Sequence, residues 1–538
     1  MYQLLIKNAN IIDGTGAPST PGSLAVQDGK IVTDPDLRLG AEEVIDAGGL
    51  SLCPGFIDGH CHDDETFGNE ATNFAKTSQG VTTVSAGNCG ESVFPASPDP
   101  ERLSLLKQFL ASYLRAPDCQ YVDEIASFTT MKAYRCYLDG RKSTTNLSLF
   151  TGHIPLRIAA MGFDNREASP EEIEKMKALL RESMEYGSRG LSVGLIYAPS
   201  CFSSKEEMVD LCRVVAEYDG FFAVHLRNEA DTFEEAVQEA IDIAEAAGCR
   251  LNLSHHKVCG AENWGKVKTT LQMIKDARAR GLKVHTDVYP WTATGNYLNI
   301  CLPKEFFANG PEKMCELLKD PEIRAELKEK ILTTDGRYTN CGGFDHIKIC
   351  GAPETPEAEG LFVSEYAAKI GKDPFEAYFD LCQQNGHKAQ AAYFAMSEED
   401  LETVLMDENA VICSDSYDIS VDNAVHPRCF GTFPRAIGYY ARERKLMSIE
   451  EMVHKMNQAT ADFLCIPNKG VIRDGYDADL VLFDPGKIRE TADYANSRGI
   501  SEGIERVIVA GETVYVDKKL TDRRPGKFLA YHGENSTH

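Results

Sequence analysis

The feature that most restricts the fold of this chain is a unit of helix, glycine and strand that recurs from residue 169 onward. Ser169 and Pro170 predict the start of a helix, apolar residues follow at helical spacing, and Gly187 predicts its end before a short strand over 190–194. Three further units predict buried strands over 221–224, 251–254 and 284–288. Four such units in succession favour a parallel sheet wound with helices.

Strands of the same kind are predicted outside the repeats. Three lie earlier in the chain and one lies later, over 56–57, 81–85, 147–150 and 410–413. Eight parallel strands with helices between them predict an α/β fold of the (β/α)8 TIM-barrel type, whose functional groups lie at the carboxyl ends of the strands. An open, doubly wound sheet is the less favoured alternative, because chemically active side chains follow so many different strands here.

Two regions do not fit the barrel pattern. Residues 1–53 and 469–538 alternate strand-like runs with Gly and Pro turns, so we predict that the two ends pair into one small β-sandwich domain. Residues 54–468 then form the barrel. Within them, about 295–400 is too long for a simple barrel loop and contains charged helices, which predicts an insertion over the barrel mouth.

Composition excludes several classes of protein. The 538 residues include 56 Lys plus Arg against 82 Asp plus Glu, and this net charge of −26 disfavours nucleic acid and anionic membranes as partners. No apolar stretch approaches the ~20 residues of a bilayer span, and Met1–Ile6 lacks the features of a signal peptide. The 17 cysteines, without CxxC pairs, are typical of reduced thiols. We expect a soluble, cytoplasmic enzyme acting on a small molecule, of unknown oligomeric state.

A pair of histidines follows the first predicted strand, in the stretch GFIDGHCH. Period-two alternation points the imidazoles of His60 and His62 to the same side, into the barrel, where one divalent metal can take both. An HxH pair alone is a weak signal, since two polar residues in a loop show the same pattern.

Further candidate ligands follow other strands. His225 and His255 close the fifth and sixth predicted strands, and Asp415 follows the eighth. Leaving several imidazoles and a carboxylate unpaired inside a closed barrel would cost roughly 1–3 kcal/mol each. We therefore expect them to converge with His60 and His62 on metal.

One cysteine has a context that suits a ligand. The strand over 81–85 runs into Ala86, Gly87, Asn88, Cys89 and Gly90, and glycines on both sides let the backbone bring the thiol close to the barrel axis. A thiolate with two imidazoles is a zinc donor set, and Cys89 with His225 and His255 leaves one tetrahedral position for water. Most cysteines are small buried hydrophobic residues, and this interpretation is kept for the other sixteen.

Together these residues resemble the amidohydrolase superfamily and, within it, the N-acyl-D-amino-acid deacylases, or D-aminoacylases. The resemblance spans nearly the whole chain, through GFIDGHCHDD, TSQGVTTVSAGNCG, TGHIPLR, GLSVGLIYAPS, HLRNEADT, SHHK, DVYPWTA, SDSYD, HPRCFGTFPRAIG and GVIRDGYDADLVLFDP. Many members of the superfamily bridge two metals with a modified lysine on the fourth strand, where this chain has Ser192, Val193 and Gly194. The D-aminoacylase branch uses a cysteine after the second strand instead, and Cys89 matches it.

The resemblance implies zinc-dependent hydrolysis of the amide of N-acyl-D-amino acids. It implies one tight zinc on Cys89, His225 and His255, and a second, weaker or empty position near His60, His62 and Cys89. Asp415, a ligand candidate, also matches the catalytic aspartate of the family. A carboxylate beside an activated water can take its proton and return it to the leaving amine.

The resemblance also implies a site for the substrate carboxylate. Lys257 and Arg428 match carboxylate-binding residues of the family, and the planar guanidinium of Arg428 can grip a carboxylate through two bonds. Tyr289 matches a substrate-contacting tyrosine. The chain departs from the family after Tyr289, because an expected serine is replaced in the run TATG. His153 and Tyr197 follow the third and fourth strands and are further candidates for lining the pocket.

Three functions follow from these patterns. The favoured one is deacylation of N-acyl-D-amino acids. The second keeps the metal and changes the bond, as in a cyclic-amide hydrolase of the hydantoinase or dihydropyrimidinase type or a D-specific dipeptidase. The third is a scaffold without catalysis, which is disfavoured because none of the six expected metal-site residues is missing.

Overall fold

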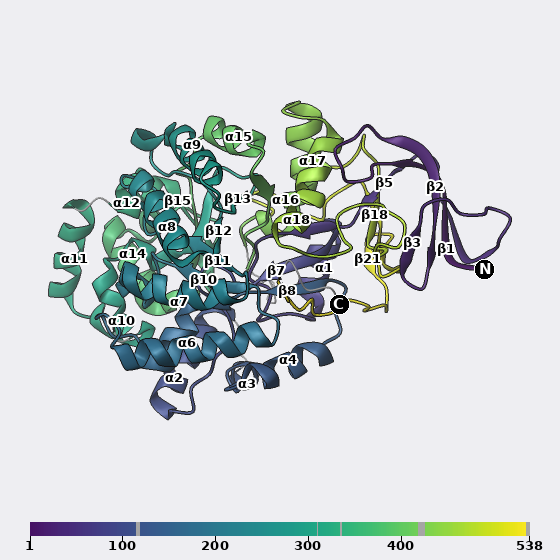
Figure 1. Ribbon diagram of the computed structural model, residues 1–538. Coiled ribbons are helices and arrows are strands. Elements are labelled where there is room, and N and C mark those ends of the chain that lie inside the picture. Colours follow the sequence, from purple (N-terminus) through teal and green to yellow (C-terminus); the bar gives the residue numbers. More distant parts are fainter. Residues whose placement is uncertain (115–118, 309, 334–335, 418–424, 534–538) are drawn as a thin grey trace.

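The computed structural model describes residues 1–114, 119–308, 310–333, 336–417 and 425–533. Figure 1 shows a barrel surrounded by helices, a β-sheet on one side of it, and a group of helices including α11 and α14 on the other. The predicted fold class is confirmed. A search of the described residues found no helix with the length and apolar character needed to cross a membrane.

The barrel contains all eight predicted strands. In chain order they are β6 (Phe56–Asp58), β7 (Val81–Ala86), β8 with β9 (Asn146–Leu149 and Thr151–Gly152), β10 (Gly190–Gly194), β11 (Phe221–His225), β12 (Arg250–Leu253), β13 (Val284–Val288) and β17 (Ala410–Ile412). Neighbouring strands are parallel, in the orders β6-β7-β8 and β9-β10-β11-β12-β13-β17. They are buried on both faces, as expected for parallel strands covered by helices.

Backbone hydrogen bonds close this sheet into a barrel. The amide of Asp415, after the last strand, donates to the carbonyl of His60 at 2.9 Å, and the amide of His62 donates to the carbonyl of Ser416 at 2.9 Å. The first and eighth strands are therefore neighbours. The first bond joins two site candidates, His60 and Asp415, and the second joins the candidate His62 to Ser416, so closure of the barrel brings the first and last candidate ligands together.

Helices cover the barrel between its strands. They are α1 (Glu70–Thr77), α2 (Pro100–Leu114), α3 (Cys119–Ile125), α4 (Met131–Gly140), α5 (His153–Met161), α6 (Pro170–Glu185), α7 (Lys205–Glu217), α8 (Phe233–Ala247), α9 (Lys266–Ala279), α15 (Glu398–Met406), α16 (Arg428–Arg435), α17 (Ile449–Met456) and α18 (Gln458–Phe463). The start of α6 has the predicted capping box, in which Ser169 and Glu172 each bond the backbone amide of the other.

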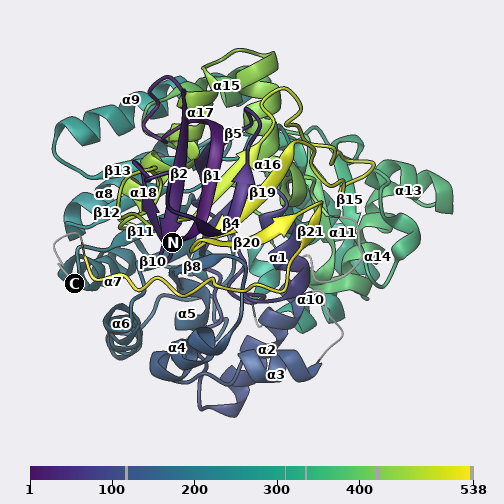
Figure 2. The same ribbon diagram turned by 90° about the vertical axis from the view of Figure 1, so that its right-hand side faces the viewer.

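Strands from both ends of the chain form one sheet. Its nine strands are β1 (Tyr2–Ile11), β2 (Thr20–Gln27), β3 (Lys30–Val32), β4 (Ala41–Asp46), β5 (Ser51–Pro54), β18 (Leu480–Phe483), β19 (Ile504–Val509), β20 (Glu512–Val516) and β21 (Lys519–Leu520). The two ends join where β5 pairs antiparallel with β18, and Figure 2 shows the early strands beside the late ones.

The central strands β5 and β18 of this sheet are buried on both faces. Along β18, Leu480 and Leu482 pack into a core of the terminal sheet, whereas Val481 and Phe483 pack into the barrel core. Alternate side chains of a strand point to opposite faces, so β18 fastens the sheet to the barrel. After β21 the chain leaves the sheet and pairs its backbone with Leu147 of β8.

The insertion has its own sheet and core. Strands β14 (Thr294–Tyr297), β16 (Gln390–Tyr393) and β15 (Ile347–Gly351) form a three-stranded antiparallel sheet. With it lie α10 (Pro311–Leu317), α11 (Pro321–Thr333), α12 (Arg337–Asn340), α13 (Val363–Ile370) and α14 (Pro374–Asn385). Their apolar side chains form a cluster separate from the barrel core.

Candidate active site

The six side chains predicted to bind metal lie together at the carboxyl ends of the barrel strands. All six are buried. They come from the ends of five strands: His60 and His62 follow β6, Cys89 follows β7, His225 ends β11, His255 follows β12 and Asp415 follows β17. Closure of the barrel brings them together across more than 350 residues of sequence.

Three groups of possible ligand atoms lie close together among the described residues; two of them contain Cys89, and the third is His60, Asp287 and Cys413. In the first, Cys89, His225 and His255 each offer one atom, and these atoms lie within 4.8 Å of one another. The Sγ atom of Cys89 is 3.4 Å from Nε2 of His255, and the rings of His225 and His255 are 4.4 Å apart. This is the tight set that the sequence predicted.

The second group consists of His60, His62, Cys89 and Asp415. Nε2 of His60 is 3.4 Å from both Cys89 Sγ and Asp415 Oδ1, and Nε2 of His62 is 3.2 Å from Asp415 Oδ1. Cys89 belongs to both groups, so its sulfur lies where it can bridge two ions.

The chemistry of the first group fits zinc. Burial lowers the pKa of His225 and of His255, which keeps both imidazoles neutral and able to donate a lone pair. Among the described residues, Nε2 of His225 has no hydrogen-bond partner. Burial also raises the pKa of the Cys89 thiol, and a bound cation reverses that effect by stabilising the thiolate.

Three of these residues have a backbone conformation that is rare outside glycine. The φ angles of Cys89, His255 and Asp415 are 53°, 36° and 48°. Non-glycine residues in this region cost of order 1–3 kcal/mol and persist only where the surrounding structure enforces them, which is common at functional sites. Nothing in the sequence marked these conformations.

Asp287, at the seventh strand, is a site residue that the sequence analysis missed. Its carboxylate lies 3.1 Å from Nδ1 of His60 and accepts hydrogen bonds from the amide of His255 and from the side chain of Asn252. A carboxylate on Nδ1 holds the imidazole with Nε2 toward the metal position. The available signal was a carboxylate inside a predicted buried strand, VHTDV.

Glu229 is the second missed residue. It follows β11, and its Oε1 atom lies 3.2 Å from Nδ1 of His255 and contacts the ammonium of Lys257. It therefore orients His255 as Asp287 orients His60. No periodicity marks Glu229, because it lies in a loop four residues after His225.

The two predicted carboxylate-binding residues, Arg428 and Lys257, both lie against the ring of Tyr289. Nη1 of Arg428 donates to Asp415 Oδ2 at 2.6 Å, and its guanidinium lies 4.8 Å from the ring centre of Tyr289. The ammonium of Lys257 lies 5.8 Å from the same ring. The Lys257 ammonium also contacts Glu229 and lies 2.8 Å from Nδ1 of His255.

The neighbours of Asp415 favour the ionised form of its carboxyl group. Burial by itself raises the pKa of this carboxyl, but the Arg428 guanidinium and the nearby imidazoles lower the pKa well below its usual range. Asp415 is therefore ionised.

Of the two remaining pocket candidates, one lies at the site and one does not. The hydroxyl of Tyr197 is 3.5 Å from Nδ1 of His225 and accepts a hydrogen bond from Asn296 of the insertion. His153 instead bonds to Ser200 and Glu207.

Comparison with known proteins agrees with this arrangement. The family model described as "Amidohydrolase family" matches residues 43–325 and 415–515. An N-acyl-D-aspartate deacylase of Alcaligenes xylosoxydans xylosoxydans is 33% identical, over 98% of this chain and 94% of that protein. The D-aminoacylase of the same organism is 32% identical, over 98% of each chain. The chain belongs to the amidohydrolase family.

A solved relative supports the same branch of the family. The N-acyl-D-glutamate deacylase of Bordetella bronchiseptica, in complex with zinc and a phosphonate mimic of the tetrahedral intermediate, superposes on this amidohydrolase with a TM-score of 0.82. The two chains are 32% identical, and the match covers 98% of this chain and 99% of that one. The predicted membership of the N-acyl-D-amino-acid deacylases is confirmed.

The fourth strand of this amidohydrolase supports Cys89 rather than supplying a lysine. On β10, Ser192 contacts the carbonyl of Gly87 and accepts a hydrogen bond from the amide of Gly90 at 3.1 Å. The backbone packs so closely that a Cβ atom on Gly194 would lie 2.3 Å from the carbonyl oxygen of Cys89. The glycines thus bring the Cys89 loop against β10, where a lysine side chain would not fit without displacing it.

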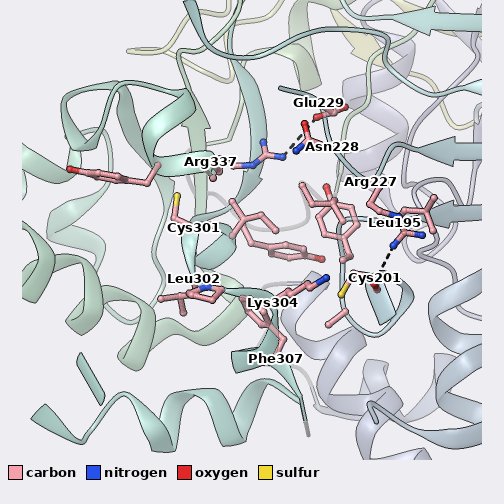
Figure 3. A pocket seen from close by; sticks show the side chains of 18 of the residues that line it. Leu195, Cys201, Arg227, Asn228, Glu229, Cys301, Leu302, Lys304, Phe307 and Arg337 are labelled. Carbon is pink, nitrogen blue, oxygen red and sulfur yellow. Dashed lines mark hydrogen bonds and ion pairs between the residues drawn. The ribbon is translucent and has the colours of Figure 1, made fainter. Parts of the chain in front are cut away.

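Beside the cluster lies a much larger cavity. A space of about 40 Å³ is bordered by five of the six metal-site residues, all except His60, together with Tyr289 and Arg428. The adjoining cavity measures about 590 Å³ and lies between the strand ends β9–β12 and the insertion. Figure 3 shows Arg337 of α12 on its wall, turned toward Glu229, whose Oε2 lies 3.8 Å from the guanidinium.

Proposed function

We propose that this amidohydrolase is a zinc-dependent N-acyl-D-amino-acid deacylase, which hydrolyses the amide to a carboxylate and a free D-amino acid. The observation that carries the proposal is one sulfur shared by two ligand groups, Cys89 with His225 and His255, and Cys89 with His60, His62 and Asp415. The relatives named for N-acyl-D-aspartate and D-amino acid deacylation support it.

Cys89, His225 and His255 are assigned as the ligands of the tighter zinc position. His60, His62 and Asp415 with Cys89 are assigned to a second, weaker one. Zinc in such a site acts as a Lewis acid, polarising a substrate carbonyl and making water more acidic. Asp287 and Glu229 position the imidazoles of His60 and His255 and do not themselves react.

Asp415 is assigned as the proton-transfer group. Its ionised carboxylate accepts a proton from the attacking water and returns it to the amide nitrogen, because an amine anion is too poor a leaving group to depart unprotonated. Arg428 keeps the carboxylate ionised and oriented through the 2.6 Å hydrogen bond.

Arg428 is assigned a second task, binding the α-carboxylate of the substrate. Nη1 is engaged by Asp415, but Nε has no hydrogen-bond partner among the described residues although it is buried. A buried donor without a partner is costly, and a carboxylate seated here satisfies it. Tyr289 and Lys257 border the same small space as Arg428, and they add a hydroxyl group and a positive charge to it.

The test is a panel of N-acetyl D- and L-amino acids, with release of the free amine measured on protein of known zinc content. We expect hydrolysis of D- but not L-substrates, and loss of activity on chelation that added zinc restores. Opening of hydantoins without release of amine from any N-acetyl-D-amino acid would instead identify a cyclic-amide hydrolase. Protein that binds no zinc and hydrolyses neither class would be a scaffold.

The cell compartment is proposed as the cytoplasm. The cysteines of the described segments are all free thiols, most of them buried. Reduced thiols in such number are typical of reducing compartments. Fractionation of cells that express the protein tests this assignment.

The division into domains is likewise a proposal. Residues 1–53 with 469–538 form the sheet domain, and 54–468 form the barrel with an insertion at about 295–400. The pairing of β5 with β18 and the separate apolar cluster of the insertion support this division. Limited proteolysis, read as the order in which these segments are released, tests the boundaries.

A further inference from the structure

The cavity of about 590 Å³ beside the metal site is mainly apolar. The barrel contributes Ile154 and Leu195, and the insertion contributes Ile300, Leu302 and Phe307. Figure 3 shows Leu195 and Leu302 on different walls of the cavity, with Phe307 near Lys304. Binding pockets for small molecules are typically about 300–1,000 Å³, so this space is large enough for a ligand group of its own.

The cavity adjoins the reaction site. Glu91, Tyr197, Glu229 and Arg337 border both the cavity and the smaller space at the metal ligands. Arg428 and Tyr289 border only the smaller space. A substrate whose α-carboxylate lies at Arg428 and whose amide lies at the metal ligands therefore directs its remaining groups into the cavity.

The cations on the cavity wall are largely neutralised by acids of the protein itself. Arg227 forms an ion pair with Glu239, and Arg337 lies 3.8 Å from Glu229. Lys330 pairs with Glu326 at 2.9 Å. A second carboxylate of a substrate therefore finds no unpaired cation among these three.

We propose that the cavity binds a large apolar group of the substrate, so that the enzyme prefers N-acyl-D-amino acids bearing such a group over those with an acidic side chain. The inference rests on the proposed deacylase function. The group can be the D-side chain or the acyl chain, which share this chemistry. An acetyl group and a methyl side chain leave most of the cavity unfilled, whereas each further buried methylene gains about fourfold in binding.

Sequence comparison does not make this choice, since the chain is 33% identical to an N-acyl-D-aspartate deacylase and 32% identical to a D-aminoacylase. The walls of the cavity favour the apolar group, because burying a carboxylate against apolar side chains costs free energy and burying an apolar group does not.

The experiment has two arms on zinc-loaded wild-type protein, measured as kcat/KM. One arm keeps the acetyl group and compares D-Ala, D-Leu, D-Phe, D-Asp and D-Glu. The other keeps D-Ala and lengthens the acyl chain from acetyl to octanoyl. We expect a rise of at least tenfold with apolar size in one arm, which also identifies the group that enters the cavity, and values for D-Asp and D-Glu at least tenfold below D-Leu.

Filling the cavity provides a second measurement. Cys201 borders the cavity (Figure 3), so Cys201→Phe should lower kcat/KM for the largest apolar substrate at least fivefold while leaving that for the smallest nearly unchanged. Cys136 is exposed on α4 away from the cavity, and Cys136→Phe is the matched control, expected to change neither value.

Lys304 supplies the sharpest counter-test, because it is exposed at the cavity wall and no carboxylate of the described chain pairs with it. We expect the Lys304→Met enzyme to keep the same order of preference, with apolar substrates above D-Asp and D-Glu. If D-Asp or D-Glu substrates are the best in the wild-type enzyme and Lys304→Met lowers them tenfold, the cavity is an acid-binding site and the proposal is wrong. Flat kcat/KM in both arms also overturns it, whereas no hydrolysis of any N-acyl-D-amino acid overturns the deacylase function itself.

Discussion

At the barrel mouth, ionisable side chains from strands remote in sequence lie 2.6–3.4 Å from one another, whereas the facing insertion presents mainly apolar side chains to a cavity of about 590 Å³. A substitution in the first region would disturb several side chains, because each carboxylate or imidazole contacts the next one. The second is open on one side and spacious. We therefore assign the chemistry to the barrel mouth and propose that the selection of substrate belongs to the cavity, which the barrel and the insertion line together.

The largest effect should come from the sulfur that the two ligand groups share. Cys89→Ala removes a ligand from both groups at once, so we expect zinc content to fall below one ion per chain and turnover of every substrate to fall below detection. Metal analysis and amine release measure both. Cys136→Ala, at an exposed cysteine, is the control. A Cys89→Ala enzyme that keeps its zinc would contradict the assignment of the barrel mouth.

The next largest effect separates proton transfer from metal binding. Asp415→Asn keeps the shape of the side chain but cannot take a proton, so kcat should fall at least roughly 10²-fold. The tight zinc should stay bound, because Cys89, His225 and His255 are untouched. Near-normal kcat in a zinc-loaded Asp415→Asn enzyme would remove Asp415 from the mechanism.

A smaller effect is expected at Glu229, which contacts the ligand candidate His255 but is not itself assigned as a ligand. Glu229→Gln weakens the hold on Nδ1 of His255 and should lower zinc affinity roughly 10- to 100-fold, as is typical for groups that orient a metal-binding histidine. Competition with a chelator of known affinity measures it. Glu239→Gln, which disturbs the Arg227 ion pair on the cavity wall, should leave zinc affinity unchanged.

The smallest effect should come from the insertion and should depend on the substrate. Leu302→Ala enlarges the cavity, so we expect kcat/KM for the preferred apolar substrate to fall about three- to tenfold, with zinc content unchanged. Leu332→Ala, at an exposed leucine of α11, is the matched control. An equal loss for all substrates would show that the insertion acts on chemistry and would break the comparison between the two regions.

Much of the fold could be predicted because its signals are local. Each of the eight barrel strands was marked by a short apolar run, and α6 by its capping box. The site could be predicted only where a polar residue ended such a run, as His225 does, or where a motif resembled a family, as around Cys89. Asp287 and Glu229 escaped prediction because Asp287 lies inside a strand and not at its end, and Glu229 lies in a loop without periodicity.

The sequence by itself determined the order of strands and helices, the family, and the identity of the metal-site candidates, because periodicity and residue chemistry are properties of neighbours along the chain. Only the tertiary structure decided that Cys89 lies between two ligand groups, that Arg428 is bound to Asp415, and that an apolar cavity adjoins them. Some of these relations join residues more than a hundred positions apart, such as Cys89 and His255. Others depend on the left-handed backbone at Cys89, His255 and Asp415. All of them exist only once the barrel has closed.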